Sequence, residues 1–403
     1  MYDYRKLDEG LFYVGAGDRR LELFENMFPL PNGVAYNSYV LLDEKTVLFD
    51  TIDNSVLEQY LENVKAVLDG RDLDYLIVHH LEPDHCAGIE RVMERYQKAI
   101  LLCSKKAKDL LEQFYGVQPW WERIQLIAEG DTLETGSRTL QFVGAPMVHW
   151  PEVLMTYETT RGWLFSADAF GAFGALDGHV FADQVNLERD WMEPIRRYYV
   201  NIVGRQGNNV AGVLRKAAAL DIRMILPLHG LVFRTKEDIA LMIEKYRLWS
   251  TYQAEEDGVV LVYGSMYGAS QLAVEKLASV LADKGVKNLR IFDVSKTHYS
   301  SIISELFRFS NAVFACNNYN TELFPMMDAM LRELMMLNFD NHKVSLIYNM
   351  SWGGKAAQIA RDILEKGKKM EFVGEVLTVK SALKAEQLPQ VEALADAIIE
   401  SMS

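Results

Sequence analysis

A chain of 403 residues is too long for one ordinary hydrophobic core, and we expect it to fold as two domains. Apolar residues make up 49% of the chain and charged residues 24%, a composition that is typical of folded proteins and excludes long disordered stretches. The formal net charge of -14 argues against a nucleic-acid partner, because binding to a phosphate backbone requires clustered Lys and Arg side chains.

The amino terminus and the cysteines both indicate a reducing, cytoplasmic compartment. The first residues lack the basic and apolar regions of a secretory signal, and no apolar run approaches the length of a membrane span. Cys86, Cys103 and Cys316 are far apart and form no C-x-x-C pair. We therefore expect three buried thiols, neither disulfides nor an all-cysteine metal site, and no membrane partner.

Short apolar runs separated by turn signals fill the first half of the chain. We predict strands of a buried sheet from these runs, at Tyr39–Leu42, Thr46–Asp50, Tyr75–His79 and Ala99–Cys103. Between two of the runs, apolar residues recur at helical spacing behind an Asn54-Ser55 cap signal, which predicts a helix over Ser55–Leu68. Strands and helices are therefore mixed in this half.

Near residue 250 the pattern changes to a regular alternation, so we predict domains at residues 1–252 and 253–403. The predicted strands of the second domain are Val259–Tyr263, Leu289–Val294, Ala312–Cys316, Lys343–Asn349 and Gly374–Val379. The helices that follow them are predicted at Gln271–Asp283, Ser301–Phe309, Glu322–Leu337, Ala356–Lys366 and from Ala385 onward. Because parallel strands joined by helices need right-handed crossovers, the alternation predicts an open, doubly wound parallel sheet.

The strongest functional signal is a cluster of ionisable side chains that follows the apolar run beginning at Tyr75. Its candidate metal ligands are His80, Glu82, Asp84 and His85. Because side chains that leave one strand end can point to a common centre, one loop can supply ligands to two adjacent metal ions. A two-metal site needs more ligands, and each of three further candidates follows another apolar run: His149, Asp168 and His229.

Other histidines have simpler explanations. An isolated histidine is more often a structural or surface residue than a ligand, and we interpret His179, His298 and His342 in this way. That explanation is weak for the cluster, because burying four ionisable groups within six residues would be costly without a metal ion. His79 adjoins the cluster with the opposite strand parity, so it either orients a ligand or lines the loop.

The pattern around His80 is similar to that of the metallo-β-lactamase fold, whose hydrolases bind zinc through His-x-His-x-Asp-His. In this sequence Glu82 stands in place of the second of those histidines. A carboxylate favours a harder, redox-active metal such as iron, whereas imidazole and thiolate favour zinc. The complete ligand pattern, with the segments around His149 and Asp168, resembles the flavodiiron proteins over nearly the whole chain. The resemblance implies a metallo-β-lactamase-like αββα domain followed by a flavodoxin-like domain.

The resemblance also implies how the seven ligands divide between two irons. The iron nearer the flavin would be held by His80, Glu82 and His149. The other iron would be held by Asp84, His85 and His229, with Asp168 as the bridge between them. In the family, the residue at the position of His85 does not always coordinate.

A phosphate-binding loop is predicted between the strand Val259–Tyr263 and the next helix. It combines hydroxyl groups, a glycine and the first amides of that helix, in the order Ser265, Met266, Tyr267, Gly268, Ala269 and Ser270. The loop has neither the Gly-x-Gly-x-x-Gly pattern of dinucleotide sites nor the Gly-Lys-Ser ending of nucleoside triphosphate sites. It resembles the flavodoxin loop for FMN, and the predicted five-strand domain favours this interpretation over a plain turn.

Two further loops are expected to hold the flavin ring at the carboxyl edge of the sheet. They contain Asn317, Asn318, Tyr319 and Asn320, and then Asn349, Met350, Ser351, Trp352 and Gly353. We expect Tyr319, Met350 and Trp352 to cover the ring, and asparagine amides to reach its polar edge. The sequence departs from the family here, because flavodiiron proteins commonly have Pro-Thr at the positions of Asn317 and Asn318 and a more glycine-rich second loop.

The resemblance implies an oxidoreductase that reduces O2 to water, NO to N2O, or both, with electrons relayed through FMN to two irons. It also implies a head-to-tail homodimer, or a dimer of such dimers, in which the FMN of one subunit serves the irons of the other. No cysteine follows Cys316, so a built-in rubredoxin is not expected, and no nicotinamide fingerprint is present. We therefore expect a rubredoxin or a flavin-containing reductase as a separate electron donor.

Two other functions fit parts of the sequence. One is a zinc hydrolase of the metallo-β-lactamase type that carries a flavodoxin-like regulatory domain. The other is a pure electron carrier whose first domain is only a scaffold. Glu82 and the phosphate loop argue against the hydrolase, and the full set of seven ligand-type residues argues against the carrier.

Overall fold

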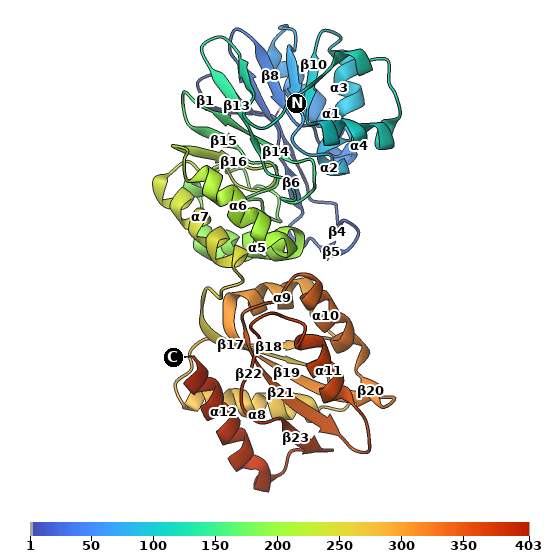
Figure 1. Cartoon of the computed structure of the whole chain (residues 1–403), viewed down its shortest axis with the longest axis vertical. Helices are drawn as coiled ribbons and strands as arrows, with labels where there is room; N and C mark the ends of the chain where they lie inside the picture. The colour runs from blue at the N-terminus through green and yellow to red at the C-terminus, as the bar shows by residue number, and fades with distance from the viewer. Residues whose placement is uncertain (1–2, 403) are drawn as a thin grey trace. The chain divides into compact units, whose positions relative to one another are not determined.

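The structure, a computed structural model, describes residues 3–402 and divides into two compact units (Figure 1). The first unit comprises the chain up to Tyr199 together with Asn208–Tyr246. The second comprises Val200–Gly207 and the chain from Arg247 onward. Each unit has its own sheet core, and each is described separately below.

Two β-sheets form the centre of the first unit. The larger sheet has the order β1-β2-β7-β8-β9-β10-β11, with strands Arg5–Asp8, Leu11–Tyr13, Tyr39–Leu42, Thr46–Phe49, Tyr75–Ile77, Ile100–Cys103 and Ile124–Leu126. The smaller has the order β12-β13-β14-β15-β16, with strands Thr132–Glu134, Thr139–Gly144, Leu154–Glu158, Trp163–Phe165 and Met224–Leu226. Two short pairs complete the unit: β3 (Ala16–Asp18) with β6 (Val34–Tyr36), and β4 (Leu23–Phe24) with β5 (Phe28–Pro29).

Helices flank both sheets and give the unit αββα layers (Figure 1). Beside the larger sheet lie α1 (Leu57–Leu68), α2 (Pro83–Cys86), α3 (Ile89–Arg95) and α4 (Lys105–Tyr115). Beside the smaller sheet lie α5 (Met192–Tyr198), α6 (Gly207–Ala217) and α7 (Lys236–Ser250). The predicted helix over Ser55–Leu68 begins two residues later, because Asp53 caps a short 3-10 turn at Asn54–Val56 that precedes α1.

The two sheets of the first unit pack face to face through apolar and aromatic side chains. Phe49 of β8 and Phe165 of β15 stack with ring centroids 3.7 Å apart and an interplanar angle of 10°. Both rings are fully buried, in a cluster that includes Leu41, Leu140 and Leu226. Burial of large apolar side chains is the main stabilising contribution here, and it fixes the strand ends that carry the site.

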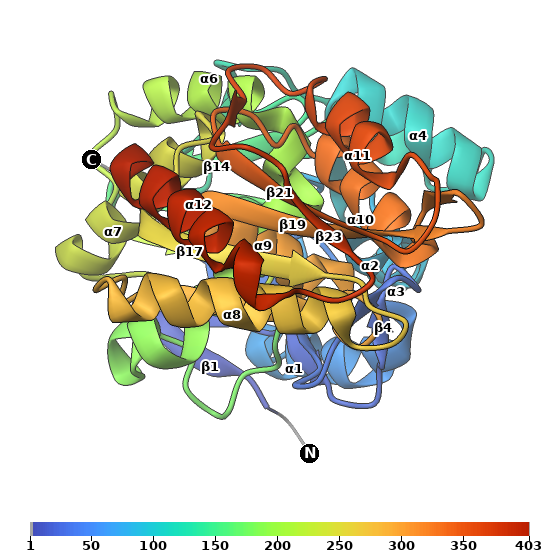
Figure 2. The ribbon, with the colours of Figure 1, turned by 90° about the horizontal axis from the view of Figure 1, so that it is seen from below.

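The second unit is a parallel sheet covered by helices on both faces (Figure 2). Its strands, in the order β18-β17-β19-β21 with β22 and β23 beyond, are Leu289–Asp293, Glu256–Tyr263, Phe309–Tyr319, Lys343–Met350, Glu371–Phe372 and Leu377–Lys380. One face carries α8 (Ala269–Asp283) and α12 (Leu388–Ser401). The other carries α9 (Tyr299–Arg308), α10 (Pro325–Met336) and α11 (Ala356–Leu364). The main strands pair in parallel, as the predicted doubly wound sheet requires.

One segment of the second unit differs from the prediction. Residues Asn317–Tyr319, predicted as a loop, extend strand β19, and the predicted helix over Glu322–Leu337 begins only at Pro325. Glu322–Leu323 instead form β20, which pairs antiparallel with β19. The two residues of the turn, Asn320 and Thr321, have φ of 50° and 67°, the left-handed geometry that closes a tight hairpin. Pro325 then begins α10. Proline is tolerated at the first position of a helix because an N–H there has no partner within the helix.

Smaller differences affect the other predicted elements. The fourth strand extends through Met350, so Asn349 and Met350 belong to β21 and not to a loop. The predicted strand Gly374–Val379 is Leu377–Lys380, and the predicted helix end at Phe309 is instead the first residue of β19. Cys86, Cys103 and Cys316 are buried free thiols, as predicted. No helix among residues 3–402 is long and apolar enough to cross a membrane.

Candidate functional site

Loops at the carboxyl ends of strands from both sheets carry the seven predicted metal ligands. From the larger sheet, His80 and Glu82 follow β9, and the short helix α2 that comes next contains Asp84 and His85. The smaller sheet contributes the turn between β13 and β14, and the loops after β15 and β16, which carry His149, Asp168 and His229 respectively. Because β15 and β16 run parallel, their carboxyl ends meet at the same edge. Pro83 at the start of α2 fixes the turn that directs its side chains inward.

Four of these side chains form one group, in which the potential ligand atoms all lie within 4.8 Å of one another: His80, Glu82, His149 and Asp168. Oε2 of Glu82 lies 3.2 Å from Nε2 of His80 and 3.0 Å from Nε2 of His149. Oδ2 of Asp168 lies 3.1 Å from Nε2 of His149 and 3.7 Å from Nε2 of His80. Two imidazoles and two carboxylates thus present one atom each to a common point.

The other three side chains form a second, buried group: Asp84, His85 and His229. The Nε2 atoms of His85 and His229 lie 2.9 Å apart, and both are within 3.4 Å of Oδ2 of Asp84. Asp168 also reaches this group, since its Oδ1 lies 3.1 Å from Nε2 of His85. One carboxylate therefore presents a different oxygen to each group.

Several acceptor atoms of the site have no hydrogen-bond donor among the described residues. Oδ1 of Asp84 is one of them, and Oδ2 of Asp84 and Oδ1 of Asp168 lie near imidazole nitrogens without the geometry of a hydrogen bond. A buried carboxylate oxygen without a donor is costly, and a cation among the converging Nε2 and oxygen atoms removes that cost. The residues present therefore fit two adjacent metal ions bridged by Asp168.

The charges of the site control the protonation of its histidines. Burial lowers the pKa of His80, but Asp168, Glu152 and Glu82 outweigh burial and raise that pKa well above its usual value. Burial also lowers the pKa of His149, and hydrogen bonds to Asp168 and Glu82 raise it to about 9. Metal binding must displace these protons from the imidazoles. Metal affinity is therefore expected to fall as the pH falls.

The pKa values of the carboxylates in the first group shift in the opposite direction. Burial raises the pKa of Glu82, but the hydrogen bonds and charges of His149 and His80 lower it well below its usual value. Burial likewise raises the pKa of Asp168, while the charges of His85 and His80 lower it well below the usual value. Both side chains are therefore ionised and available to cations at neutral pH.

Three residues that the sequence analysis did not select contact the predicted ligands. Glu152 accepts hydrogen bonds from Nδ1 of His80 at 2.9 Å and from the amide of Leu81 at 3.0 Å. The hydroxyl of Tyr198 donates to Oδ2 of Asp168 at 3.0 Å. Glu25 lies in the turn between β4 and β5, where partial burial and then Glu82 raise its pKa to about 8. Only Glu152 had a sequence signal, as a carboxylate three residues after a candidate ligand.

His79 points away from both groups and into the core. Its Nδ1 lies 2.5 Å from Oδ2 of Asp50, and its Nε2 lies 2.7 Å from the hydroxyl oxygen of Thr156. Asp50 also accepts the backbone N–H of His79 at 2.7 Å. His79 therefore ties the loop that bears His80 to strands of both sheets, and it offers no ring nitrogen to a metal ion.

The three histidines interpreted as structural or surface residues lie outside both groups. His179 is exposed, and His298 caps α9 by accepting the amide of Ser300. His342 is buried against Phe339, and burial lowers its pKa to about 4. These placements agree with the interpretation from the sequence.

The second unit contains a cavity of about 800 Å³ at the carboxyl edge of its sheet. It is lined by every predicted flavin residue except Gly353, and additionally by Leu272, Thr321, Ser381 and Ala382. Ser381 and Ala382 follow β23, so the end of the fifth strand contributes to the cavity as the ends of the first, third and fourth do. A volume of this order is typical of cofactor sites.

The phosphate loop has the local geometry that an anion needs. Gly268 has φ of 91°, a left-handed conformation, and its N–H donates to the hydroxyl oxygen of Ser265 at 3.0 Å. The helix α8 begins at Ala269, so its first amides and positive dipole end lie beside the cavity. Asn317 lines the same cavity with a buried side chain that has no hydrogen-bond partner among the described residues. The residues present therefore fit a phosphate-bearing flavin.

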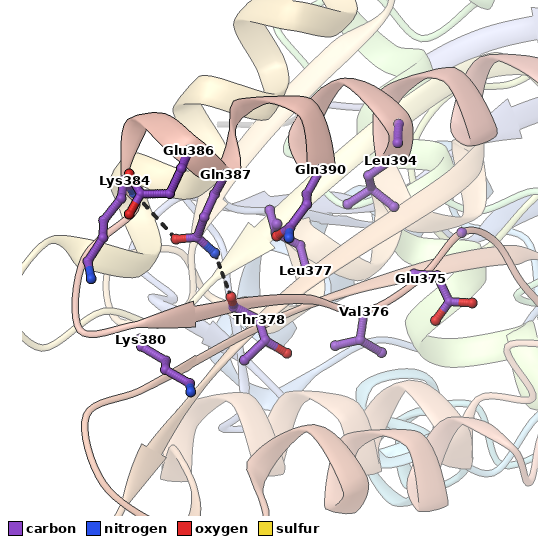
Figure 3. Close-up of a pocket in the computed structure, with 12 residues that line it drawn as sticks. Glu375, Val376, Leu377, Thr378, Lys380, Lys384, Glu386, Gln387, Gln390 and Leu394 are labelled. Atoms are coloured by element: carbon purple, nitrogen blue, oxygen red, sulfur yellow. Dashed lines mark hydrogen bonds between the residues drawn. The ribbon is translucent and has the colours of Figure 1, made fainter.

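Another cavity of similar size lies between β23 and α12 (Figure 3). Its polar side chains include Lys380, Lys384 and Glu375, and Gln387 closes one wall by donating to the carbonyl of Thr378 at 2.8 Å. None of the predicted site residues lines it. Among the described residues, only the two groups joined by Asp168 bring three or more metal-ligating side chains together.

Known proteins resemble this chain in sequence. A family model described as ODP family beta lactamase matches residues 34–230. The anaerobic nitric oxide reductase flavorubredoxin of Pectobacterium carotovorum subsp. carotovorum is 30% identical over 365 residues, which cover 89% of this chain and 71% of that protein.

Solved structures resemble the whole chain. The rubredoxin oxygen:oxidoreductase from Desulfovibrio gigas gives a TM-score of 0.92 at 24% identity, covering 99% of this chain and 98% of that one. The flavodiiron protein from Giardia intestinalis gives a TM-score of 0.92 at 24% identity, covering 100% and 98%. These structures confirm the predicted fold, a metallo-β-lactamase-like domain followed by a flavodoxin-like domain. Together with the sequence relative, they place this chain in the flavodiiron protein family.

Proposed function

We propose that this flavodiiron oxidoreductase holds two irons and one FMN, and reduces O2 to water, NO to N2O, or both. The observation that carries the proposal is the pair of ligand groups joined by the two oxygens of Asp168. The proposed iron ligands are His80, Glu82, Asp84, His85, His149, Asp168 and His229. The proposed domains are residues 1–252 for the irons and 253–403 for FMN.

The printed names of the relatives support the two substrates. The relative from Pectobacterium carotovorum is named for nitric oxide reduction, and the structural neighbour from Desulfovibrio gigas for oxygen and rubredoxin. The ligand set is compatible with either substrate, since both bind to a reduced metal pair. A zinc hydrolase is disfavoured by the carboxylate of Glu82 and by the flavin cavity.

When bound, the iron pair and FMN supply the substrate-binding and electron-transfer chemistry. The chain's own residues orient the side chains that would hold the irons. Glu152 and the carbonyl of Ala35 accept from Nδ1 of His80 and of His229, so both rings present Nε2 to the metal centre. Tyr198 donates to Oδ2 of Asp168 and fixes the plane of that carboxylate, which would be shared by the two irons. Burial of these groups excludes bulk water from the site.

The proposal predicts two irons and one FMN per chain. We expect both in the full-length protein produced with ample iron, because all proposed ligands converge without rearrangement. Metal analysis gives the iron content, and the visible absorption spectrum gives the flavin content. Protein that contains zinc alone and has no yellow colour would contradict the proposal and favour the hydrolase.

We further propose that electrons arrive from a rubredoxin or a flavin-containing reductase at the exposed rim of the flavin cavity. Tyr319 and Trp352 are 46% and 69% exposed there and offer aromatic surface to a docking protein. Because the two proposed cofactor sites belong to different units, we propose a head-to-tail homodimer, or a dimer of such dimers, in which one subunit's FMN serves its partner's irons.

The proposed donor gives a second prediction. NADH alone should drive negligible O2 or NO consumption, because no nicotinamide fingerprint is present in the sequence. A rubredoxin with its NADH-dependent reductase should restore consumption, which an oxygen or NO electrode measures. Rapid turnover with NADH and no carrier would show that the chain binds nicotinamide in a form that its motifs do not predict.

A further inference from the structure

Asn317 is a buried side chain of the flavin cavity that the protein itself does not satisfy. It lies at the end of β19, is 4% exposed, and lines the cavity. Neither Nδ2 nor Oδ1 of its amide has a hydrogen-bond partner among the described residues. A buried amide with both groups unpaired is costly, so such a group in a cavity indicates that a ligand supplies the missing bonds.

The neighbouring Asn318 differs, because its amide is fully engaged within the protein. Nδ2 of Asn318 donates to the hydroxyl oxygen of Tyr348 at 3.0 Å and to the carbonyl of Gly353 at 3.4 Å. Its Oδ1 accepts the amide of Ala356, the first residue of α11, at 3.2 Å. Tyr348 in turn donates to the carbonyl of Gly354 at 3.0 Å. Asn318 therefore holds the loop after β21 and caps the following helix.

The position of Asn317 indicates which part of a flavin it contacts. A Cβ atom built on Gly264, which immediately precedes the phosphate loop, would lie 3.2 Å from Oδ1 of Asn317. The backbone of Asn317 is fixed by its carbonyl, which accepts the amide of Phe324 at 3.1 Å. The unpaired amide therefore lies next to the first residues of the phosphate loop. It does not lie at the outer rim of the cavity, where Trp352 is exposed.

We propose that Asn317 binds the phosphate-bearing ribityl chain of FMN directly, whereas Asn318 is a positioning residue that shapes the second flavin loop without contacting FMN. This inference rests on the proposed FMN site and assigns different roles to two adjacent asparagines. It also explains why the unpaired amide is tolerated in the protein. The cost of leaving it unpaired is recovered when FMN binds.

The test uses full-length protein from which FMN has been removed, titrated with FMN and with riboflavin. Asn317→Leu keeps the size of the side chain and removes both polar groups. FMN should then bind about tenfold more weakly or worse. The thermal midpoint of the flavin-free protein should stay equal or rise, because no protein hydrogen bond is lost.

A matched control lies on the same strand. Asn311 is 2% exposed, and its amide is paired with Ser310 and Ser401 at the end of β19 away from the cavity. Asn311→Leu should lower the thermal midpoint and leave FMN affinity unchanged, the reverse of Asn317→Leu. Equal FMN affinity in Asn317→Leu and the parent protein would overturn the proposal.

A second variant tests the contact with the phosphate-bearing chain. Asn317→Asp adds a negative charge, which should weaken FMN by a larger factor than riboflavin, since only FMN carries phosphate. Equal weakening of both ligands would overturn the assignment to the phosphate side. If the parent protein bound neither ligand, the proposed function itself would fail, and this outcome is distinct from the failure of the Asn317 assignment.

Discussion

Replacing Glu82 by histidine is expected to abolish O2 and NO reduction while FMN remains bound. Oε2 of Glu82 lies within 3.2 Å of both imidazoles of its group, so the substitution changes an atom that faces the proposed iron directly. The change replaces a carboxylate by an imidazole and so gives a nitrogen-rich ligand set, which favours zinc over iron. We expect activity to fall by more than about 100-fold, since even outer-shell substitutions cost 10- to 100-fold at metal sites.

The measurements are metal content, flavin absorbance and substrate consumption with a saturating electron donor. Glu129→His is the matched control, because Glu129 is an exposed glutamate of the same unit that pairs with Lys216 at 2.6 Å, outside both ligand groups. The control should keep its iron and its activity. Full reductase activity in Glu82→His would contradict the ligand role of Glu82, whatever metal the variant contained.

Replacing Glu152 by alanine is expected to weaken iron binding by about 10- to 100-fold, although Glu152 is not itself a proposed ligand. Its Oε1 accepts from Nδ1 of His80 and from the amide of Leu81, so it fixes both the ring and the loop that carries it. Without that acceptor, the proton on Nδ1 is no longer held in place and the ring can turn. Nε2 then no longer faces Glu82 and Asp168 in every molecule.

A comparison of alanine with glutamine separates positioning from general destabilisation. Glu152→Gln keeps an acceptor oxygen of the same reach, so it should restore most of the iron affinity measured by competition with a chelator. The thermal midpoint of metal-free protein reports the structural contribution of the same side chain. If iron affinity were unchanged in Glu152→Ala at a lowered thermal midpoint, Glu152 would be a structural residue only.

The convergence of the seven candidate ligands was predictable, because each follows an apolar run and strands that point the same way bring such positions to one edge. The carboxylate at Glu82, in the loop around His80, is the feature of the sequence on which the proposal of iron over zinc rests. The partners of those ligands were not predictable in the same way. Tyr198 reaches Asp168 from α5 across a sequence separation of 30, and no periodic pattern distinguishes it from other buried tyrosines.

The side-chain partners of the proposed flavin residues were not predictable from the sequence either. The sequence places Asn317 and Asn318 side by side, and both were expected to reach the flavin. The bonds that distinguish their roles come from Tyr348 and Ala356, 30 and 38 residues further on, which meet Asn318 only once β21 is paired beside β19. The hairpin at Asn320 was also unexpected, because an Asn-Thr turn lacks the glycine that usually marks such a turn.

The distribution of the ligands along the chain has a consequence for how the first unit holds together. His85 and His229, whose Nε2 atoms lie 2.9 Å apart, are separated by 144 positions in the sequence and follow strands of different sheets. A metal ion shared by such residues is a cross-link that closes a very long loop, and closing long loops removes much conformational entropy from the unfolded chain. Bound iron would then cross-link the two sheets of the first unit. Its loss would lower the stability of that unit as well as abolish catalysis.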